Sequence, residues 1–477
     1  MPPRLALCWG RMNRRSFLAS SAVTLADRTL ARAGPAWAFS RSAEKARAHY
    51  TLRIEPCKVE IAPDIVIDTI GYNGQVPGPI LRVREGVPVT IDVTNQTANA
   101  DIVHWHGLAI DSLNDGAMEE GSPMIPASGS LRYHFTPRPV GTRWYHTHAP
   151  AGANLSIGTY TGQFGFLLVE GQQNPGCYDQ EIFLAIHHWQ PSFVPMVEIM
   201  REASANAPLT PGSDVGYKYA TINQHMLGAG EPIRVKHGQR VLMHLLNASG
   251  TENVVLALPG HTFEVIAMDG NPVPNSLAVE SLSLAVAERI DAIVEMNAPG
   301  VWILGSTLAK SRAMGLGVVI EYAGATGAPT WRDPASAEWD YSEFASPARA
   351  LEPDETFTLT FRDIGPMNGS RFDTWTINNQ SWPKIDPLHV RQGRRYRMIF
   401  RNGSGDQHPM HLHRHTFEIT RVGTKEFSGL HKDVVNVMPL DAVAVDFVAD
   451  NPGDTLLHCH QALHMDFGFM QLMKYVG

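Results

Sequence analysis

Three passages of the sequence share one layout, and this repeat limits the possible fold more than any other feature. Each passage begins at an Asn, crosses a strand-like segment to a Gly, and crosses a second such segment to another Asn nine residues later. The first Asn residues are Asn73, Asn223 and Asn378, the Gly residues are Gly86, Gly238 and Gly393, and the last are Asn95, Asn247 and Asn402. Alternating residues such as V-T-I-D-V-T are typical of half-buried strands, and the Gly indicates a turn. The sequence therefore predicts three copies of one β unit, about 150 residues apart.

Units of this length and strand content are expected to form Greek-key sandwiches or barrels, so we expect an all-β fold. Turn-rich segments suggest the boundaries: GQQNPGC at residues 171–177, and a linker rich in Ala, Pro and Gly at residues 323–353. The predicted domains are residues 45–172, 173–325 and 350–477.

The N-terminal segment, residues 1–38, is predicted to be an export signal. Arg14 and Arg15 precede Phe17, Leu18 and a short apolar run, and the small-residue sites ARA and AWA follow. Such twin-arginine signals resemble those of proteins that the twin-arginine machinery exports already folded, which suggests a periplasmic or secreted protein. The alternative is a short surface helix, because the apolar run is weak. Elsewhere the sequence contains no segment that is long and apolar enough to span a bilayer, so we expect no membrane insertion.

The net charge narrows the possible binding partners, and the cysteine content allows a disulfide. Removal of residues 1–38 would remove six Arg and one Asp and lower the formal net charge from −8 to −13. This acidic chain is a poor partner for nucleic acid or an anionic membrane. Among the four Cys, Cys57 and Cys177 could form a disulfide in an oxidising compartment.

Four clusters of His indicate the chemistry. HWHG contains His104 and His106, WYHTH contains His146 and His148, HPMHLH contains His408, His411 and His413, and HCHQALH contains His458, Cys459, His460 and His464. Random placement of the 21 His would give roughly one H-x-H pair, whereas the sequence has five. Any single buried His could simply bond to a backbone carbonyl, but this concentration favours metal binding.

Strand parity separates the ligands into two sites. Residues two apart on a strand share a face, so each H-x-H pair presents two imidazoles to one site, while Cys459 points away from His458 and His460. His408 lies an odd number of residues before His411 and can join Cys459, and His464 can complete that group. Two imidazoles and a thiolate are the ligands of a blue copper centre, and the other eight His suit a polynuclear copper centre. Zinc is the competing metal, but a structural zinc site would use four ligands and usually more Cys.

With these motifs, the sequence resembles the three-domain multicopper oxidases, which include laccases, bilirubin oxidases and cuprous oxidases. All four motifs occur in order, and the resemblance covers roughly residues 50–477. It implies three cupredoxin-like domains and four copper ions, with the trinuclear cluster between the first and third domains and the second domain as a spacer. The implied ligands are His408, Cys459 and His464 for a type 1 copper, His104 and His411 for a type 2 copper, and His106, His146 and His460 with His148, His413 and His458 for a type 3 pair.

The resemblance also suggests residues around the coppers. Asp115 stands where the family carries an acid beside the cluster, although Asp-Gly is also a common turn pair. Some relatives have a second acid where this chain has Leu463 and Met465, and Asp466 is the nearest substitute.

At the axial position of the type 1 copper the family spacing gives Phe469, which does not coordinate and should raise the potential. Met470 would be the ligand if the turn shifted by one residue, and both residues could simply belong to the core. Arg414 replaces a Gly that relatives often have, which leaves the shape of that turn open.

The leading functional hypothesis is a monomeric laccase-like oxidase that oxidises phenols or aromatic amines and reduces O2 to water. The alternative is an oxidase of cuprous or ferrous ions, although the 18 Met residues are scattered without a Met-rich run. An exported structural protein that has lost catalysis is a third hypothesis, but no ligand is missing.

Overall fold

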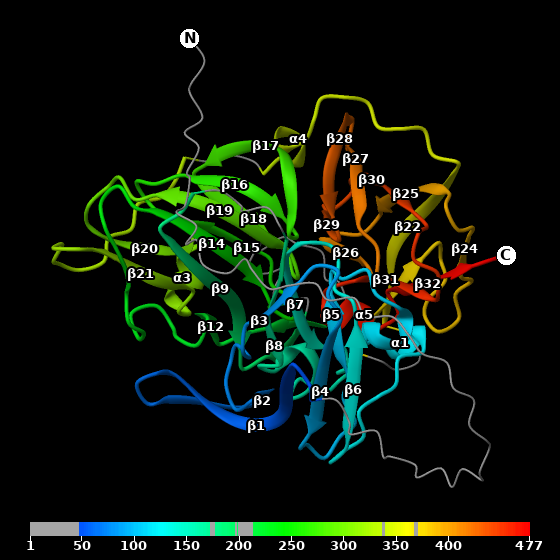
Figure 1. Ribbon diagram of the computed structural model, residues 1–477, viewed down its shortest axis with the longest axis horizontal. Helices are drawn as coiled ribbons and strands as arrows, with labels where there is room; N and C mark the ends of the chain where they lie inside the picture. The colour runs from blue at the N-terminus through cyan, green and yellow to red at the C-terminus, as the bar shows by residue number, and fades with distance from the viewer. Residues whose placement is uncertain (1–46, 172–176, 196–197, 199–212, 336–338, 367–370) are drawn as a thin grey trace, which may run out of the picture. The chain divides into compact units, whose positions relative to one another are not determined.

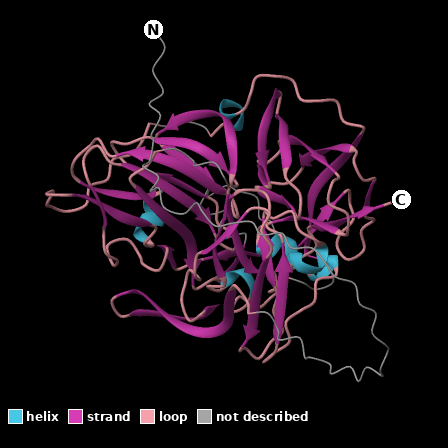
Figure 2. Cartoon of the chain, in the orientation of Figure 1, coloured by secondary structure: helices cyan, strands magenta, loops and turns pink. Residues whose placement is uncertain are grey.

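Strands dominate the structure, as Figures 1 and 2 show, and the all-β prediction is confirmed. The computed structural model describes residues 47–477, apart from residues 172–176, 196–197, 199–212, 336–338 and 367–370. The predicted export signal, residues 1–38, lies outside the described residues. None of the helices that the structure describes is long and apolar enough to cross a membrane.

The first part of the chain forms two sheets. Its elements are β1 (Tyr50–Ala62), β2 (Ile65–Tyr72), β3 (Leu81–Arg84), β4 (Val89–Asn95), β5 (Val103–His106), α1 (Ser112–Asp115), the 3-10 turn η1 (Met118–Glu120), β6 (Ser130–Phe135), β7 (Gly141–Thr147), the 3-10 turn η2 (Gly158–Tyr160) and β8 (Phe164–Glu170). The strand orders are β2-β1-β4-β6 and β3-β8-β7-β5.

The second part forms two larger sheets and a short strand pair. Its elements are β9 (Gln180–Trp189), β10 (Ser192–Pro195), β11 (Ser213–Gly216), β12 (Tyr219–Ile222), β13 (Ile233–Val235), β14 (Arg240–Asn247), β15 (Val254–Ala257), β16 (Phe263–Met268), β17 (Asn271–Val279), β18 (Ser281–Leu284), β19 (Arg289–Glu295), β20 (Val301–Ser306), α3 (Ala309–Ala313) and β21 (Gly317–Tyr322). The sheets are ordered β12-β9-β14-β19-β16-β17 and β13-β21-β20-β15-β18, and β10 pairs with β11.

The third part repeats this plan. Its elements are α4 (Tyr341–Phe344), β22 (Glu355–Pro366), β23 (Asp373–Ile377), β24 (Leu388–Val390), β25 (Arg395–Asn402), β26 (His408–Leu412), β27 (Phe417–Val422), β28 (Lys425–Lys432), β29 (Val434–Val437), β30 (Ala442–Val448), β31 (Thr455–Cys459), α5 (Ala462–Asp466) and β32 (Met470–Tyr475). The sheets are ordered β23-β22-β25-β30-β27-β28 and β24-β32-β31-β26-β29. The domain bounds 45–172, 173–325 and 350–477 stay a prediction, because residues 48–477 cluster as one compact unit.

The repeat in the sequence corresponds to a repeat in topology. The strand that follows each repeated Gly is β4, β14 or β25, and each runs parallel to the first long strand of its part, β1, β9 or β22. The burial of β4 alternates residue by residue, as predicted, whereas β14 is buried on both faces. The same pattern thus serves a half-exposed sheet in the first part and an internal sheet in the second.

Backbone geometry explains the repeated Asn residues. The first Asn of each passage has a positive φ, between 52° and 57°, and its side-chain amide bonds to the backbone of the neighbouring strand. The side-chain oxygen of each last Asn accepts an N–H two residues later, at Thr97, Ser249 and Ser404. Asn tolerates the left-handed backbone conformation of the first position better than most residues, and at both positions its short amide side chain hydrogen-bonds nearby backbone groups.

Apolar packing joins the parts of the chain. One core cluster runs from Leu184 to Met473 and so includes residues of both the second and third parts, while a second cluster joins Trp144 of the first part to Trp189 of the second.

Cys57 carries a free thiol, so the disulfide considered for Cys57 and Cys177 is not formed.

Candidate metal centre

Two pairs of antiparallel strands, together with the residue that directly follows β7, β26 and β31, supply eight of the predicted ligands. His104 on β5 lies opposite His146 on β7, and His411 on β26 lies opposite His458 on β31. Figure 1 shows these strands of the first and third parts close to one another. The eight residues, called the imidazole cluster below, are His104, His106, His146, His148, His411, His413, His458 and His460, and all are at most 5% exposed.

Ring contacts bring the two strand pairs into one site. The ring centroids of His104 and His413 are 4.0 Å apart, and those of His106 and His411 are 3.8 Å apart with the rings nearly parallel. Potential ligand atoms lie within 4.8 Å of one another in the groups His104/His106/His146, His104/His411/His413 and His148/His413/His458. The remaining residue, His460, has its ring centroid 5.2 Å from that of His106.

A second group, called the thiol site below, contains His408, Cys459 and His464. The Cys459 Sγ atom is 3.8 Å from Nδ1 of His408 and 3.6 Å from Nδ1 of His464, and the two Nδ1 atoms are 3.3 Å apart. Cys459 follows His458 directly, so alternate faces of the same strand end belong to the two groups, as the parity of the sequence predicts.

Hydrogen bonds determine which nitrogen of each ring is available. The Nδ1–H groups of His104, His146, His411 and His458 donate to the carbonyl oxygens of Asp115, Thr147, Asp433 and Cys459 over 2.7–2.9 Å. These tautomers are assigned from the bonding partners, and each leaves a lone pair on Nε2. The Nε2 atoms of His104, His146, His411 and His460 are buried without a partner. A buried nitrogen without a hydrogen-bond partner destabilises the folded protein by itself, but its lone pair is available to bind a cation.

His106 has the opposite arrangement. Its Nε2–H donates to the Asp433 carboxylate over 3.1 Å, and its Nδ1 is the buried atom without a partner. The hydrogen bond to Asp433 therefore leaves Nδ1 rather than Nε2 of His106 free to bind a metal.

Burial keeps the imidazoles neutral. Desolvation, reinforced by neighbouring imidazoles, lowers the pKa of His148 and His411 to about 3. The same causes lower the pKa of His106, His413 and His460. Neutral imidazole is the form that binds metals.

For the thiol, desolvation raises the pKa of Cys459 above its ordinary value. The thiolate would thus form only together with a compensating cation, and coordinated thiols are deprotonated in this way.

Aromatic side chains surround the thiol site. The Trp375 ring centroid lies 3.9 Å from that of His464, and Phe469 lies 4.8 Å from His408. Ser404 Oγ is 2.7 Å from Nε2 of His408, which leaves Nδ1 of that ring toward Cys459. Met470 belongs to a separate apolar cluster, while Phe469 and Cys459 share the large core, and Phe469 stays the residue predicted for the axial position.

Asp115 contacts the imidazole cluster and also ends a turn. Its Oδ2 accepts the Nδ1–H of His413 over 2.8 Å and lies 3.2 Å from Nδ1 of His104. Gly116 follows with φ 91°, and a Cβ there would lie 1.8 Å from the carbonyl oxygen of Val103. A residue other than Gly would therefore push α1 away from β5, so the Asp-Gly turn is part of what holds Asp115 at the cluster.

Glu120 and Arg414 extend this polar side of the cluster. Glu120 Oε1 accepts the N–H of Leu456 over 2.6 Å and lies 3.4 Å from Nδ1 of His413. Arg414 has φ 59°, the left-handed conformation that favours the Gly of relatives. The whole residue is 1% exposed, and its guanidinium donates to the carbonyl oxygens of Ile110, Asn451, Pro452 and Asp454 and to Oγ1 of Thr455. The turn keeps its left-handed shape, and the Arg side chain joins the first part of the chain to the loop before β31.

Asp466 lies beside the cluster at a small cavity. Its Oδ2 accepts the N–H groups of Ala151 and Gly152 over 2.9 and 2.7 Å, and its Oδ1 is buried without a partner. The cavity, of about 10 Å³, is also lined by His146, His148, His458, His460 and Met465. Its volume is close to that of one water molecule. Leu463 instead packs in an apolar cluster with Tyr160.

A larger pocket reaches the thiol site from outside. Its volume is about 250 Å³, and its lining includes His464, Trp375, Leu463 and the acids Asp214, Glu252, Asp373 and Asp406. Burial raises the pKa of Glu252 to about 7 and that of Asp373 to about 6. A donor in this pocket would meet the His464 and Trp375 rings and a concentration of carboxyl groups.

Several of these neighbours had no signal in the sequence. Glu120 could have been suspected from its place five residues after Asp115 in the same acidic segment. Asp433 and Trp375 follow no motif and approach the ligands only through the sheet topology.

Comparison with known proteins agrees with this geometry. Models of the multicopper oxidase family match residues 56–174, 142–318 and 357–476. The multicopper oxidase MmcO of Mycobacterium tuberculosis is 29% identical over 505 residues, covering 98% of this chain and 97% of that protein. Laccase-1 of Botryotinia fuckeliana is 26% identical over 84% of this chain and 77% of that protein.

Solved structures support the fold. A laccase from Botrytis aclada superposes with a TM-score of 0.73 at 23% identity, covering 89% of this chain and 87% of that chain. Fet3p, described as a multicopper oxidase that functions in iron import, has a TM-score of 0.73 at 19% identity, covering 89% and 90%. The three parts of the chain are accordingly cupredoxin-like. The chain belongs to the multicopper oxidase family and is a copper-dependent oxidoreductase that uses oxygen as its acceptor.

Proposed function

We propose that the protein is a laccase-like oxidase that takes single electrons from phenols or aromatic amines and reduces O2 to water. The observation that carries this proposal is the link between the two groups: Cys459, the only sulfur ligand of the thiol site, is bonded through the backbone to His458 and His460 of the imidazole cluster. A donor can therefore be oxidised at one site while oxygen is reduced at another.

The ligand sets fit copper. The thiol site, with His408, Cys459 and His464, is proposed for the type 1 ion. The proposed type 2 ligands are His104 and His411, and the proposed type 3 ligands are His106, His146 and His460 with His148, His413 and His458. Unpartnered buried nitrogens and neutral rings support this assignment. When bound, four copper ions supply one-electron steps that together meet the four-electron requirement of oxygen reduction.

The chain itself has two further tasks. Trp375 and His464 form the wall at which a donor can approach the thiol site, so the donor need not enter the imidazole cluster. Water formation needs protons, and Asp115 is proposed as the acid beside the cluster because its carboxylate holds His413 and approaches His104. Asp466, at the small cavity, is the second proposed acid.

Spectra and copper content test this function. The copper-loaded mature chain should show the blue thiolate band and the family's four coppers. Under anaerobic conditions, a phenol should bleach the band, and oxygen should restore it. A colourless protein without copper would contradict the ligand assignment.

The acidic pocket favours a second candidate, an oxidase of cuprous or ferrous ions. Asp214, Glu252, Asp373 and Asp406 would attract a cation to the edge of His464, whereas they offer little to a neutral phenol. In anaerobic titrations the faster donor distinguishes the two functions. Asp373→Asn combined with Glu252→Gln should raise KM for the metal ion and leave KM for a neutral phenol nearly unchanged if the second candidate is correct.

We also propose that residues 1–38 are a twin-arginine export signal and that the mature protein is periplasmic or secreted. The mature protein is proposed to be a monomer. Its proposed domains are residues 45–172, 173–325 and 350–477. Arg14 and Arg15 with the small-residue sites support export. Replacement of both Arg by Lys should retain the protein in the cytoplasm, as fractionation would show. Sedimentation analysis would test the monomer.

A further inference from the structure

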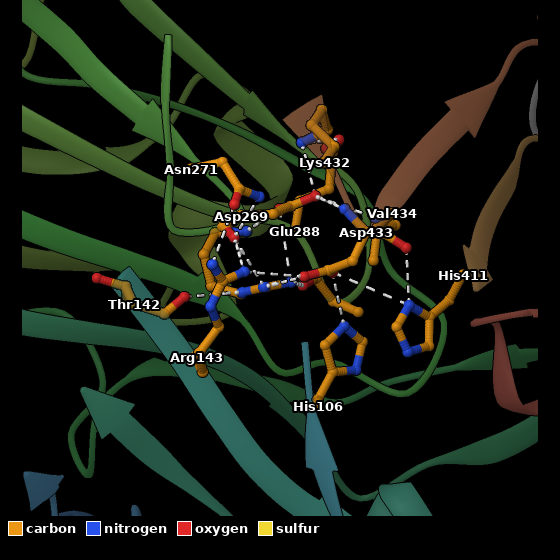
Figure 3. Close-up of polar contacts among 12 residues, drawn as sticks. His106, Thr142, Arg143, Asp269, Asn271, Glu288, His411, Lys432, Asp433 and Val434 are labelled. Carbon is orange, nitrogen blue, oxygen red and sulfur yellow. Dashed lines mark hydrogen bonds and ion pairs between the residues drawn. The ribbon is translucent and has the colours of Figure 1, made fainter. Parts of the chain in front are cut away.

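A buried network of ionised side chains joins all three parts of the chain beside the imidazole cluster (Figure 3). It contains three cations and three anions: Arg143 from the first part, Asp269, Glu288 and Arg289 from the second, and Lys432 and Asp433 from the third. Each is at most 2% exposed. Buried charges of this kind persist only when they are paired and hydrogen-bonded, and the equal numbers of cations and anions meet that condition.

Asp433 is the member of the network that touches the imidazole cluster. Its Oδ1 accepts the Nε2–H of His106 over 3.1 Å, and its carbonyl oxygen accepts the Nδ1–H of His411 over 2.7 Å. Figure 3 shows both rings directed toward this one residue. Asp433 therefore sets the available nitrogen of two imidazoles, Nδ1 in His106 and Nε2 in His411, both of which are buried without a partner.

Arg289 in turn fixes Asp433. Its Nη1 and Nη2 donate to Oδ1 and Oδ2 of the carboxylate over 2.7 and 2.6 Å, a bidentate pair that defines the plane of the carboxylate. The guanidinium also donates to the carbonyl oxygens of Ala287 and Asp269 over 3.0 and 3.2 Å. The position of Arg289 is thus determined by the backbone of the second part.

Asp269 fixes the backbone next to Asp433. Its Oδ1 accepts the N–H of Arg289 over 2.9 Å, while its Oδ2 accepts the N–H of Val434 over 3.0 Å and lies 2.9 Å from Nζ of Lys432. The segment 432–434 is therefore held by side chains of the second part on both sides of Asp433.

We propose that Arg289 is a positioning residue of the copper cluster, which acts through Asp433 to orient His106 and His411. The second part of the chain contributes no predicted ligand, yet through Arg289 it supports one ligand from the first part and one from the third. This inference rests on the proposed ligand assignment. It goes beyond that assignment because it gives the second part a role in copper binding rather than that of a spacer.

The test compares copper release from the wild type with that from Arg289→Met and Arg289→Lys. Each copper-loaded protein is dialysed against increasing concentrations of a copper chelator, and copper content, the blue band and the type 2 signal in electron paramagnetic resonance are recorded. Arg289→Met should release cluster copper at chelator concentrations about 10–100-fold lower than the wild type, the usual effect of losing a residue that orients the ligands, while the blue band remains. Arg289→Lys keeps the charge without the bidentate geometry and should lie between them.

Arg395→Met is the matched control, because Arg395 pairs with the buried Asp446 and with Glu418 of the same part of the chain. It should reduce thermal stability without changing copper release. Equal copper release from Arg289→Met and Arg395→Met would overturn the proposal, as would wild-type affinity in Arg289→Met with only a lower melting temperature. If Arg289→Met does not fold, Arg289→Lys decides between these outcomes.

A double variant tests the path through Asp433. If Arg289 acts through this carboxylate, Arg289→Met/Asp433→Asn should release copper no more readily than the weaker-binding single variant, whereas independent effects would multiply. An effect of the double variant on copper release equal to the product of the two single effects would overturn the proposed path. Failure of the proposed function is distinguishable, because the wild type itself would then lack the blue band or the cluster copper.

Discussion

The two candidate copper sites lie a single residue apart in the chain, at Cys459 and His458, yet their surroundings differ. Around the thiol site the contacts are mainly aromatic, with the Trp375 ring tilted against His464 and the Phe469 ring edge-on to His408. Around the imidazole cluster they are ionic, with Asp433 bound to Arg289 on one side and Asp115 on the other. Aromatic rings thus dominate the direct contacts of the thiol site, to which Ser404 adds one hydroxyl, whereas charged side chains support the imidazole cluster.

The difference follows from what each site must do. Electron transfer requires ligands whose potential is tuned by an apolar environment, and it moves no proton at the metal. Oxygen reduction consumes protons and needs several ligands held at once, so carboxylates that orient imidazoles are useful there. Substitutions on each side should therefore change different measurements.

Cys459→Ser should have the largest effect and separate the two sites. Replacement of the sulfur removes the ligand that gives the blue band and the through-bond link to His458 and His460. We expect no oxidase activity above background and one copper fewer than in the wild type, with the type 2 signal in electron paramagnetic resonance retained. Activity that survives this substitution would contradict the division into an electron-entry site and an oxygen site.

Asp115→Asn should impair oxygen reduction while the thiol site stays intact. Loss of the acid beside His104 and His413 should lower kcat by about 100-fold, the usual range for a positioned acid–base group. In stopped-flow experiments, anaerobic bleaching of the blue band should keep its wild-type rate, and reoxidation by oxygen should become slow.

Asp111→Asn is a suitable control for this experiment. It makes the same chemical change at the N-cap of α1, where Asp111 accepts the N–H of Asn114 over 3.2 Å on the surface. It should leave kcat unchanged. If the two variants behave alike, the role of Asp115 is structural.

Phe469→Met should change the thiol site alone. A thioether in place of the phenyl ring can act as a weak axial ligand and should lower the potential, so oxidation of poor donors slows by about tenfold or less. Met470→Leu is the matched control and should alter neither the potential nor the blue band. A change on Met470→Leu, with none on Phe469→Met, would reverse the axial assignment.

The sequence was sufficient for the fold class and for bringing the His clusters together, because period-two alternation determines which face a strand residue occupies. His408 and Cys459 could be grouped from parity alone, and the structure brings their Nδ1 and Sγ atoms to 3.8 Å. The first Asn and the Gly of each repeated passage likewise occupy left-handed positions that few other residues tolerate.

The residues that orient the predicted ligands could not be predicted, because they depend on contacts between residues far apart in the chain. His106 and Asp433 are separated by 327 positions, and Arg143 and Asp433 by 290. No local pattern selects such pairs, which form only after the three parts pack together. Arg414 is a related case: the unusual residue was visible in the sequence, but its donation to carbonyl groups of the loop before β31 was not.

The smallest expected effect concerns a buried charge that lies away from both sites. His244 lies between Asp291 at 2.8 Å and Glu181 at 3.3 Å, and Thr142 of the first part donates to the same Asp291. Although burial opposes its charge, these two acids outweigh that effect and raise the pKa of His244 to about 9. The stabilisation is fully present below the pKa of the unfolded chain, about 6.5, and is lost as the pH rises through 9.

His244→Gln removes this titration and serves as the comparison. The free energy of unfolding of the wild type should fall between pH 7 and pH 9.5 by on the order of 2 kcal/mol more than that of the variant. Thermal melts of both copper-loaded proteins at matched scan rates would measure the difference. The blue band and copper content at pH 7 should be the same in both, because His244 contacts neither site. An equal pH dependence would mean that His244 is neutral in the folded protein, and a change in copper content would mean that the charged shell of the imidazole cluster extends as far as β14.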